Sequence, residues 1–227
     1  MQVVILAAGN GKRMGEITRK VPKPMIKIKG KPILEHKIRA LPKVIDEVII
    51  IVGHLGKQIT DHFKNNFDGR RISYYFQEKL DGTGGAVHLA KDAVQEKFLV
   101  MMGDDLYHMR DIEKMLKHDL AILASEVDGI GRFGALKMDD RGHLVDIIER
   151  SEDSKSRLVN TGLYLLNKNF FEYNLVALNN GEFGLPQTLV KMSDRHEIKI
   201  ERASLWYPIG YSEDLKAAEE IVDKFNG

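Results

Sequence analysis

The sequence predicts an α/β fold in which a mostly parallel central sheet is flanked by helices. Short apolar segments rich in Val, Ile and Phe recur along the first half of the chain, and amphipathic segments with helical spacing lie between them. No low-complexity linker or short repeat period interrupts this alternation. Alternating strands and helices favour parallel strands joined by right-handed crossovers, with ligands bound beyond the carboxyl ends of the strands. We therefore expect a Rossmann-like sheet with helices on both faces.

The expected elements follow in order along the chain. Strands are predicted at residues 2–6, 47–52, 72–76, 98–102 and 120–124, and helices at residues 33–41, 57–65, 85–94 and 111–117. The second half is richer in strands, with a hairpin over 133–138 and 144–149 and further strands at 159–166 and 197–203. Residues 212–225 predict a closing helix with Ser212 as its N-cap. These strands are expected to extend one domain that covers residues 1–227.

Composition narrows the class of protein and of partner. A chain of 227 residues with 43% hydrophobic side chains can bury one good core. The 34 basic and 33 acidic side chains give a net charge of +1, so neither nucleic acid nor a membrane is an expected partner. The absence of cysteine excludes disulfides and thiolate metal sites. The opening apolar residues 3–8 lack a cationic leader and are too short to span a bilayer, so a cytoplasmic location is expected.

A glycine-rich loop, LAAGNGKRMG at residues 6–15, follows the first expected strand. Its small residues leave backbone N–H groups open to a closely approaching anion, which predicts a phosphate cradle. A dinucleotide fingerprint would need Gly or Ala at Met14, and a P-loop would need Ser or Thr after its Gly-Lys pair. Neither pattern is met, so the loop indicates phosphate binding of another kind.

A lysine held between two prolines follows this loop. Pro22 and Pro24 restrict the backbone around Lys23, which limits the entropy lost when its ammonium meets a phosphate. The segment therefore predicts a second phosphate-binding group beside the loop.

Two further polar positions follow expected strands. Gln77 precedes Gly82 and Thr83, and its carboxamide offers a donor and an acceptor to a pyrimidine edge. Asp104 follows Gly103 at the end of the apolar strand 98–102, where a metal bound to triphosphate would lie. With a phosphate loop nearby, this carboxylate favours magnesium binding. The eight histidines show no His-Glu-x-x-His pattern, so zinc is not expected.

The loop LAAGNGKRM followed by PKPM resembles the signature of the sugar-phosphate nucleotidyltransferases, also called nucleotide-sugar pyrophosphorylases. The later motifs of that family are matched in order by Gln77, Gly82-Thr83-Gly84, Gly103-Asp104, Gly134, Glu149 and Asn160-Thr161-Gly162. No hexapeptide-repeat segment follows, so the resemblance is to the short, core-only members. It implies a nucleotide-binding half over about residues 1–126 and an acceptor-binding half with the closing helix over about residues 127–227.

The resemblance also implies a role for each matching residue. Arg13, Lys23 and Asp104 would be catalytic, with Asp104, favoured over Asp105, as the Mg²⁺ ligand. The implied nucleotide-binding residues are Leu6, Ala8, Gly9, Gly11, Gln77, Gly82, Thr83 and Gly103. The implied acceptor-binding residues are Gly134, Glu149, Arg150 and Asn160. Arg150 stands where many relatives have Lys, so a planar guanidinium replaces a compact ammonium of the same charge.

The implied reaction joins a nucleoside triphosphate, with UTP or dTTP expected, to a sugar 1-phosphate and releases pyrophosphate. One alternative is cytidylyl transfer to a non-sugar phosphate such as phosphocholine or inositol phosphate, because the same loop and lysine serve any phosphate nucleophile. Another is a non-catalytic nucleotide-sugar sensor, which the presence of Arg13, Lys23 and Asp104 disfavours. The identity of the sugar and the oligomeric state stay open.

The chain departs from the family pattern at Pro208. Many members carry Trp-x-Asp-x-Gly near the end, where the aspartate completes the metal site, but residues 206–210 here read WYPIG. Magnesium accepts few protein ligands and keeps several waters. We therefore expect the metal to bind firmly only together with nucleotide, with Asp105 or a water in the vacant position.

Overall fold

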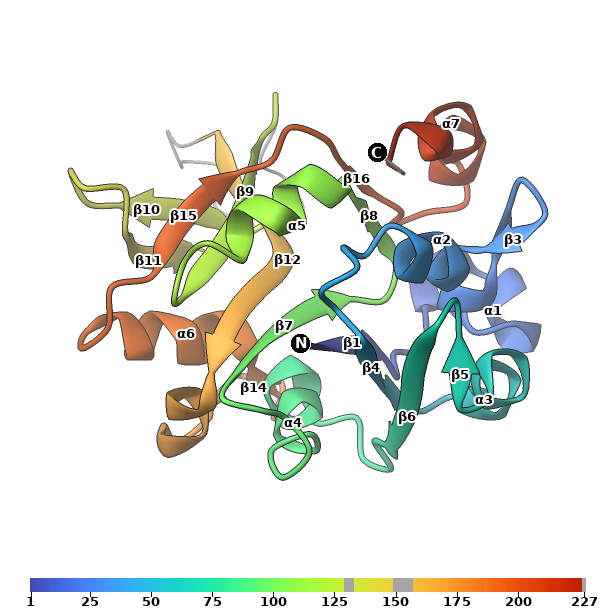
Figure 1. The fold of residues 1–227 in the computed structure, drawn as a ribbon, viewed down its shortest axis with the longest axis horizontal. Coiled ribbons are helices and arrows are strands. Elements are labelled where there is room, and N and C mark those ends of the chain that lie inside the picture. The colour runs from blue at the N-terminus through green and yellow to red at the C-terminus, as the bar shows by residue number, and fades with distance from the viewer. Residues whose placement is uncertain (129–132, 149–156, 226–227) are drawn as a thin grey trace.

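The computed structural model describes residues 1–128, 133–148 and 157–225, and its centre is one twisted sheet (Figure 1). This sheet has ten strands, and its main path runs β11-β10-β12-β7-β1-β4-β6-β5. Strand β9 pairs with β12, and β15 pairs with β9 beside this path. The predicted α/β class with a central sheet is confirmed.

The parallel half of the sheet is built around its first strand. β1 (Gln2–Ala7) is buried throughout and lies between β4 (Glu47–Val52) and β7 (Lys97–Met102), which both run parallel to it. β6 (Arg70–Phe76) runs parallel to β4, and the short β5 (Asn66–Phe67) closes the edge. Helices cover both faces of β1, β4 and β7, which accounts for the apolar residues along these three strands. The four strands predicted here are confirmed to within two residues.

The antiparallel half continues from β7 without a break. β12 (Leu158–Asn167) pairs antiparallel with both β7 and β9 (Ala121–Glu126). The predicted hairpin is confirmed as β10 (Ala135–Met138) and β11 (Leu144–Ile148), and β15 (Lys199–Arg202) lies parallel to β9. The β-rich second half therefore shares the main sheet.

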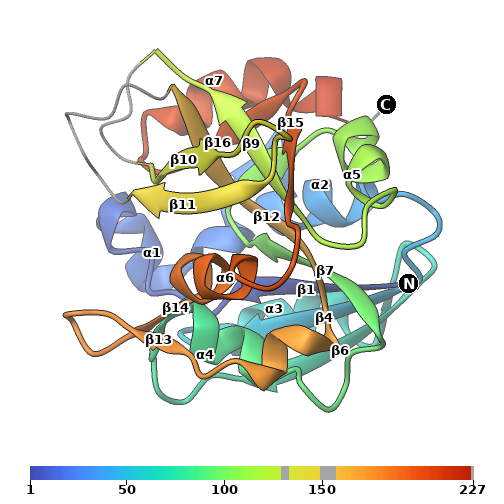
Figure 2. The ribbon, with the colours of Figure 1, turned by 90° about the vertical axis from the view of Figure 1, so that its left-hand side faces the viewer.

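Helices pack on both faces of the sheet (Figures 1 and 2). Successive strand side chains alternate between the faces, so Val3 and Ile5 point one way while Val4 and Leu6 point the other. The first face is covered by α2 (Ile33–Arg39), α3 (Gly56–Phe63) and α5 (Met109–Met115). The second face is covered by α4 (Gly82–His88) and α6 (Leu185–Ser193).

Short elements complete the fold, and several were not predicted. They are α1 (Ile17–Lys20), the hairpin of β2 (Lys27–Ile28) and β3 (Lys31–Pro32), the ladder of β8 (Asp105–Tyr107) and β16 (Trp206–Pro208), the hairpin of β13 (Val176–Ala177) and β14 (Phe183–Gly184), and single 3₁₀ turns at Lys12–Met14, Lys23–Met25, Lys168–Glu172 and Val222–Phe225. The β13–β14 hairpin lines part of the cleft described below.

The closing helix α7 (Asp214–Ile221) begins differently from the prediction. Ser212 was expected as its N-cap, but its hydroxyl donates to Glu213, and Glu213 occupies the cap position without a side-chain cap bond. Asp214 Oδ2 instead accepts from the backbone N–H groups of Gly210 and Tyr211 at 2.7 and 2.8 Å. The Ser212 prediction is wrong because the Asp214 carboxylate, two residues further on, closes this turn.

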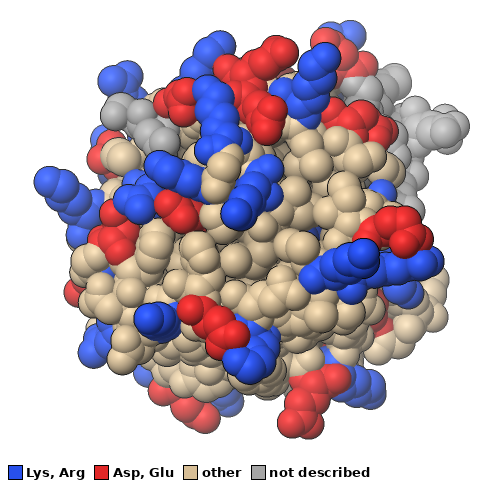
Figure 3. All heavy atoms as spheres, turned by 90° about the vertical axis from the view of Figure 1, so that its right-hand side faces the viewer, with Lys and Arg blue, Asp and Glu red and all other residues tan. Residues whose placement is uncertain are grey.

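The surface carries charges of both signs. On the face that holds α1, α3 and α7, basic and acidic side chains are interspersed around uncharged areas (Figure 3). Among the described residues, no helix has the length and apolar character needed to cross a bilayer.

A buried carboxylate ties α5 to the segment that leads into β16. Asp111 is fully buried, and its Oδ2 accepts from Ser204 N at 2.7 Å, Ser204 Oγ at 2.9 Å and Leu205 N at 3.2 Å. Hydrogen bonds to a charged acceptor are stronger than neutral ones, and removal of the acceptor leaves enclosed donors unpaired. Asp111 therefore fixes where β16 meets β8.

Asp111→Ala is expected to lower the free energy of unfolding by about 3 kcal/mol, because two backbone donors lose a charged acceptor. Urea denaturation of the variant measures this. Asp119→Ala is the matched control, because Asp119 is a fully exposed carboxylate in the chain that follows α5. It should change the free energy of unfolding by less than about 0.5 kcal/mol. Equal effects in the two variants would contradict the role given to Asp111.

Candidate active site

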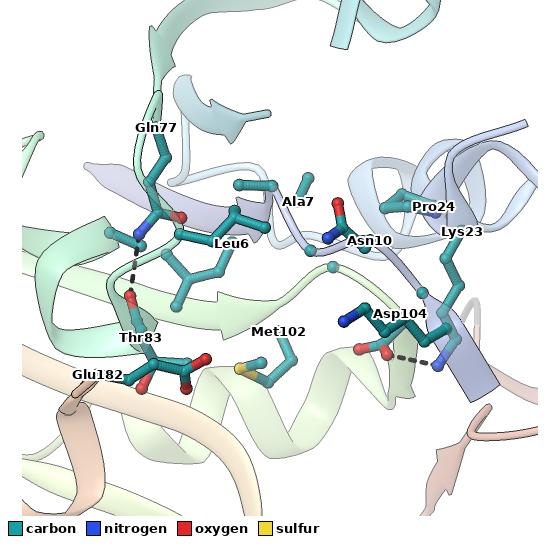
Figure 4. Close-up of a pocket in the computed structure, with 18 of the residues that line it drawn as sticks. Leu6, Ala7, Asn10, Lys23, Pro24, Gln77, Thr83, Met102, Asp104 and Glu182 are labelled. Atoms are coloured by element: carbon teal, nitrogen blue, oxygen red, sulfur yellow. Dashed lines mark hydrogen bonds and ion pairs between the residues drawn. The ribbon is translucent and has the colours of Figure 1, made fainter. Parts of the chain in front are cut away.

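A cleft of about 670 Å³ opens at the carboxyl ends of the central parallel strands (Figure 4). After β1 the chain continues to β4 on one side, and it later returns to β7 on the other side of β1. Ligands of open α/β sheets bind at such a reversal of strand order. Of the predicted site residues, those that line the cleft are Leu6, Ala8, Gly9, Gly11, Arg13, Lys23, Gln77, Gly82, Thr83, Gly103 and Asp104.

The glycine-rich loop forms one wall of the cleft. Gly11 has φ +62°, and a Cβ there would lie 2.8 Å from Thr18 Cγ2, so only glycine fits this close approach. The Thr18 hydroxyl donates to the carbonyls of Gly11 and Gly15 at 3.0 and 3.1 Å, which holds the loop folded. Within the described part of the chain, the N–H groups of Gly9 and Asn10 have no partner. They are therefore available to an anion, and the predicted phosphate cradle stays a prediction.

Lys23 and Asp104 meet at one end of this wall. Lys23 begins a 3₁₀ turn between the two prolines, and its side chain is 11% exposed. Its Nζ lies 2.6 Å from Asp104 Oδ2, and this ion pair is drawn in Figure 4. The other carboxylate oxygen of Asp104 has no protein partner among the described residues. Arg13 also lines the cleft with its guanidinium exposed and unpaired in that part of the chain.

Gln77 lies at the opposite end of the cleft. Its Nε2 donates to Asp81 Oδ1 at 2.8 Å and to the carbonyl of Gly82 at 3.0 Å. Both amide hydrogens are used, so the oxygen Oε1 is the atom left for a ligand. The sequence predicted that the carboxamide could act as donor and acceptor, whereas this arrangement commits the donors to the protein.

A hairpin that the sequence did not assign to the site covers this end. β13 and β14 bring Leu178, Glu182 and Phe183 into the lining. The N–H of Phe183 donates to the carbonyl of Asp81 at 2.6 Å, which joins the hairpin to the start of α4. The turn residues Asn179-Asn180-Gly181 were a readable hairpin signal, but only the tertiary contact shows which cleft they face.

The predicted acceptor residues are only partly described. Asn160 N donates to the carbonyl of Gly134 at 2.9 Å, so these two positions lie together on β12 and the approach to β10. The Asn160 side chain accepts from Gly162 N at 2.9 Å and donates to Tyr164 Oη at 2.7 Å. Neither Asn160 nor Gly134 lines the cleft. Glu149 and Arg150 lie outside the described residues.

The second aspartate turns away from the cleft. Asp105 Oδ2 accepts from Trp206 Nε1 at 3.1 Å, and Asp105 pairs with Pro208 in the β8–β16 ladder. Burial, with the neighbouring charge of Asp104, raises the pKa of Asp105 to about 7, while burial lowers the pKa of Lys37 to about 8. The sequence predicted Asp105 or a water at the metal-binding position that the family's aspartate would fill. Because Asp105 is bonded to Trp206, a water is favoured there.

The donor set at Asp104 suits magnesium shared with a substrate. Among the described residues, no group of three or more His, Asp or Glu side chains could hold a metal ion. Magnesium is commonly bound through one or two carboxylates together with substrate phosphates. The outward oxygen of Asp104, on the cleft that also holds the glycine-rich loop, fits that mode of binding.

The strand order and the position of the cleft define a Rossmann-like α/β protein whose ligand site lies at the reversal of strand order. The chain belongs to the nucleotidyl transferase family, whose model matches residues 2–224. It is therefore a member of the family that its loop and Pro-Lys-Pro segment resemble.

Individual relatives give the same assignment. The chain is 35% identical to the bifunctional protein GlmU of Methanocaldococcus jannaschii over 100% of its own length and 55% of that protein. It spans about half the length of such relatives. It is 31% identical to the UTP–glucose-1-phosphate uridylyltransferase AglF of Haloferax volcanii, with 99% of this chain and 97% of the relative covered. A solved structure of a candidate glucose-1-phosphate thymidylyltransferase from Bacillus anthracis has the same fold, with a TM-score of 0.88, 24% identity and coverage of 100% and 97%.

Gly82→Ala is expected to weaken nucleoside triphosphate binding by about tenfold or more, because displacement of the hairpin would cost at least ~1.4 kcal/mol. A Cβ at this position would lie 2.5 Å from the carbonyl oxygen of Phe183. Gly181→Ala is the matched control, since Gly181 also has positive φ but nothing lies within 4 Å of a Cβ there. Calorimetric titration with UTP and Mg²⁺ measures both. Equal losses would assign the effect to backbone strain alone.

Proposed function

We propose that this chain transfers the nucleotidyl group of UTP or dTTP to a sugar 1-phosphate, releasing pyrophosphate and forming a nucleotide sugar. The observation that carries the proposal is the Lys23–Asp104 pair, which puts an ammonium and a carboxylate 2.6 Å apart beside the glycine-rich loop. The name of the Haloferax relative, matched over almost its whole length, supports the same reaction. The enzyme would act in the cytoplasm with Mg²⁺ as its cofactor.

The reaction requires no covalent intermediate with the protein. An oxygen of the acceptor phosphate attacks the α-phosphorus, and the bond from that phosphorus to the bridging oxygen breaks, so pyrophosphate leaves with the bonding electrons. Catalysis then consists of positioning and charge stabilisation. Magnesium held by Asp104 would supply neutralising positive charge on the phosphate oxygens.

The chain's own cationic groups have separate tasks in this scheme. Lys23 would stabilise the negative charge that gathers around the α-phosphate, and Arg13 would bind the departing pyrophosphate. The unpartnered N–H groups of Gly9 and Asn10 would hold the phosphates in line for displacement. Lys23 is already ordered by its two prolines, so little entropy is lost when the substrate arrives.

The base preference follows from the orientation of Gln77. Its Oε1 can accept from the N3–H of uracil or thymine, where cytosine carries a lone pair. In the described part of the chain no side chain caps the first turn of α4, so its backbone N–H groups would be available to base carbonyls at the same end. Both features favour UTP or dTTP over CTP.

Pyrophosphate release across triphosphates and phosphorylated acceptors tests this function. Release with UTP or dTTP and a sugar 1-phosphate is expected. Release only with CTP and phosphocholine or inositol phosphate would replace the proposed substrates. Nucleotide-sugar binding without any release would make the protein a sensor.

Lys23→Ala is expected to leave the fold intact and to lower kcat by about 10²- to 10³-fold, because a preorganised charge in an enclosed site is commonly worth ~3–4 kcal/mol. Steady-state pyrophosphate assays measure the loss. Lys27→Ala, at an exposed lysine on the following strand, is the control and should keep wild-type turnover. Near-normal turnover of Lys23→Ala would contradict the catalytic role proposed for Lys23.

Gln77→Ala is expected to raise the KM for the triphosphate and to loosen base choice more than it lowers kcat. The reason is that Oε1 contacts the base and not the reacting phosphorus. Competition between UTP and CTP measures the preference. Gln58→Ala serves as the control, because Gln58 is exposed and its side chain donates, among the described residues, only to the Lys20 carbonyl. An unchanged base preference in Gln77→Ala would leave Gln77 with a structural role.

A further inference from the structure

A buried lysine lies behind the Gly103–Asp104 turn. Lys37 on α2 is only 3% exposed, although a lysine side chain is costly to bury. Its Nζ donates to the backbone carbonyl of Asp105 and stands 4.4 Å from the centre of the Tyr107 ring. An apolar side chain of similar length would fill the same space without the cost of a buried charge. The ammonium therefore calls for an explanation beyond packing.

The groups around Lys37 connect the proposed metal ligand to the strand of Asn160. Asp105 accepts from Trp206 Nε1 at 3.1 Å, and Tyr107 Oη donates to the carbonyl of Thr161 at 2.8 Å. Thr161 directly follows Asn160 on β12. One buried network thus joins α2, β8, β16 and β12.

The register of the β8–β16 ladder explains why a cation is needed there. Pro208 is opposite Asp105, and Trp206 is opposite Tyr107, so β16 supplies an indole donor and no carboxylate. The turn itself carries two adjacent carboxylates, Asp104 and Asp105. Lys23 compensates the first from the cleft side, and Lys37 lies on the inner side of the second.

We propose that Lys37 is a positioning residue for Asp104. Its ammonium holds the Asp105 carbonyl and offsets the paired carboxylates, which keeps Asp105 turned inward to Trp206 and Asp104 turned outward to the cleft. The catalytic consequence rests on the function proposed above, whereas the structural consequence does not. A shift of about 1 Å in a positioned group can cost about 100-fold in rate.

Lys37→Met, which keeps the length of the side chain and removes its charge, tests this role. The expected result is a fall in kcat of about 100-fold with the KM for the triphosphate within about threefold of wild type. Lys97→Met is the matched control, because Lys97 also donates to backbone carbonyls but lies at the opposite end of β7. It should retain wild-type kcat.

A second readout needs no activity. Trp206 is the one tryptophan of the chain, so its indole N–H gives a single resonance in a ¹⁵N-correlated NMR spectrum. In Lys37→Met this resonance should shift and exchange faster with solvent, while the backbone amide spectrum stays dispersed. Lys37→Arg, which retains the charge, should restore part of both the shift and the kcat.

An unchanged indole resonance together with unchanged kcat in Lys37→Met would overturn the proposal. If the backbone amide spectrum of Lys37→Met lost its dispersion, Lys37→Arg would decide. A wild-type indole resonance in Lys37→Arg without any gain in kcat over Lys37→Met would also overturn the proposal. If the wild-type protein released no pyrophosphate, the proposed function would fail, and the indole resonance would still decide whether Lys37 orients the turn.

Discussion

The site depends on the close approach of two strand ends. Gly103 N donates to the carbonyl of Leu6 at 2.9 Å, and a Cβ on Gly103 would lie 2.7 Å from that oxygen. Only glycine lets β7 end against β1 at this distance, so the glycine-rich loop and the Gly103–Asp104 turn begin at the same place. Because Gly11 also packs against the side chains of Thr18 and Lys23, close packing and the Lys23–Asp104 ion pair fix the loop, the lysine and the aspartate together. That rigidity suits a reaction catalysed by positioning.

Much of the fold follows from local pattern, since most predicted strands and helices form within two residues of their expected bounds, but the helix predicted over 85–94 is wrong in its position and runs from Gly82 to His88. The continuous apolar strands 47–52 and 98–102 and the amphipathic 33–41 segment need only their own sequence and burial. The β8–β16 ladder was not foreseen, since residues 105–107 and 206–208 lie about a hundred positions apart and each is too short to show a period. The N-cap of α7 was predicted wrongly because Ser212 and Asp214 both carry a side-chain oxygen near this turn. The backbone N–H of Gly210 donates to Asp214, whereas the Ser212 hydroxyl donates to Glu213.

The predicted nucleotide-binding residues line the cleft, whereas the described residues predicted to bind the acceptor do not. Lys23 lies between two prolines, and Gln77 and Asp104 each follow an expected strand, so sequence alone places all three near the carboxyl edge of the sheet. Lys37 carries no such signal, because a lysine within an amphipathic helix usually faces solvent. Glu182 and Phe183 reach the cleft only through the contact of their hairpin with Asp81. Asn160 was assigned by resemblance, and its side chain is engaged within β12 beside Gly162 and Tyr164.

In the proposed reaction, one cleft holds the triphosphate between the glycine-rich loop and Asp104, with the base against Gln77. A crystal structure of the protein with Mg²⁺ and an unreactive UTP analogue tests it most directly. We expect phosphates on the N–H groups of Gly9 and Asn10, a metal ion on Asp104 with water at the side of Pro208, and N3 of uracil on Gln77 Oε1. A nucleotide bound away from this loop, or a metal ion held by Asp105, would contradict it.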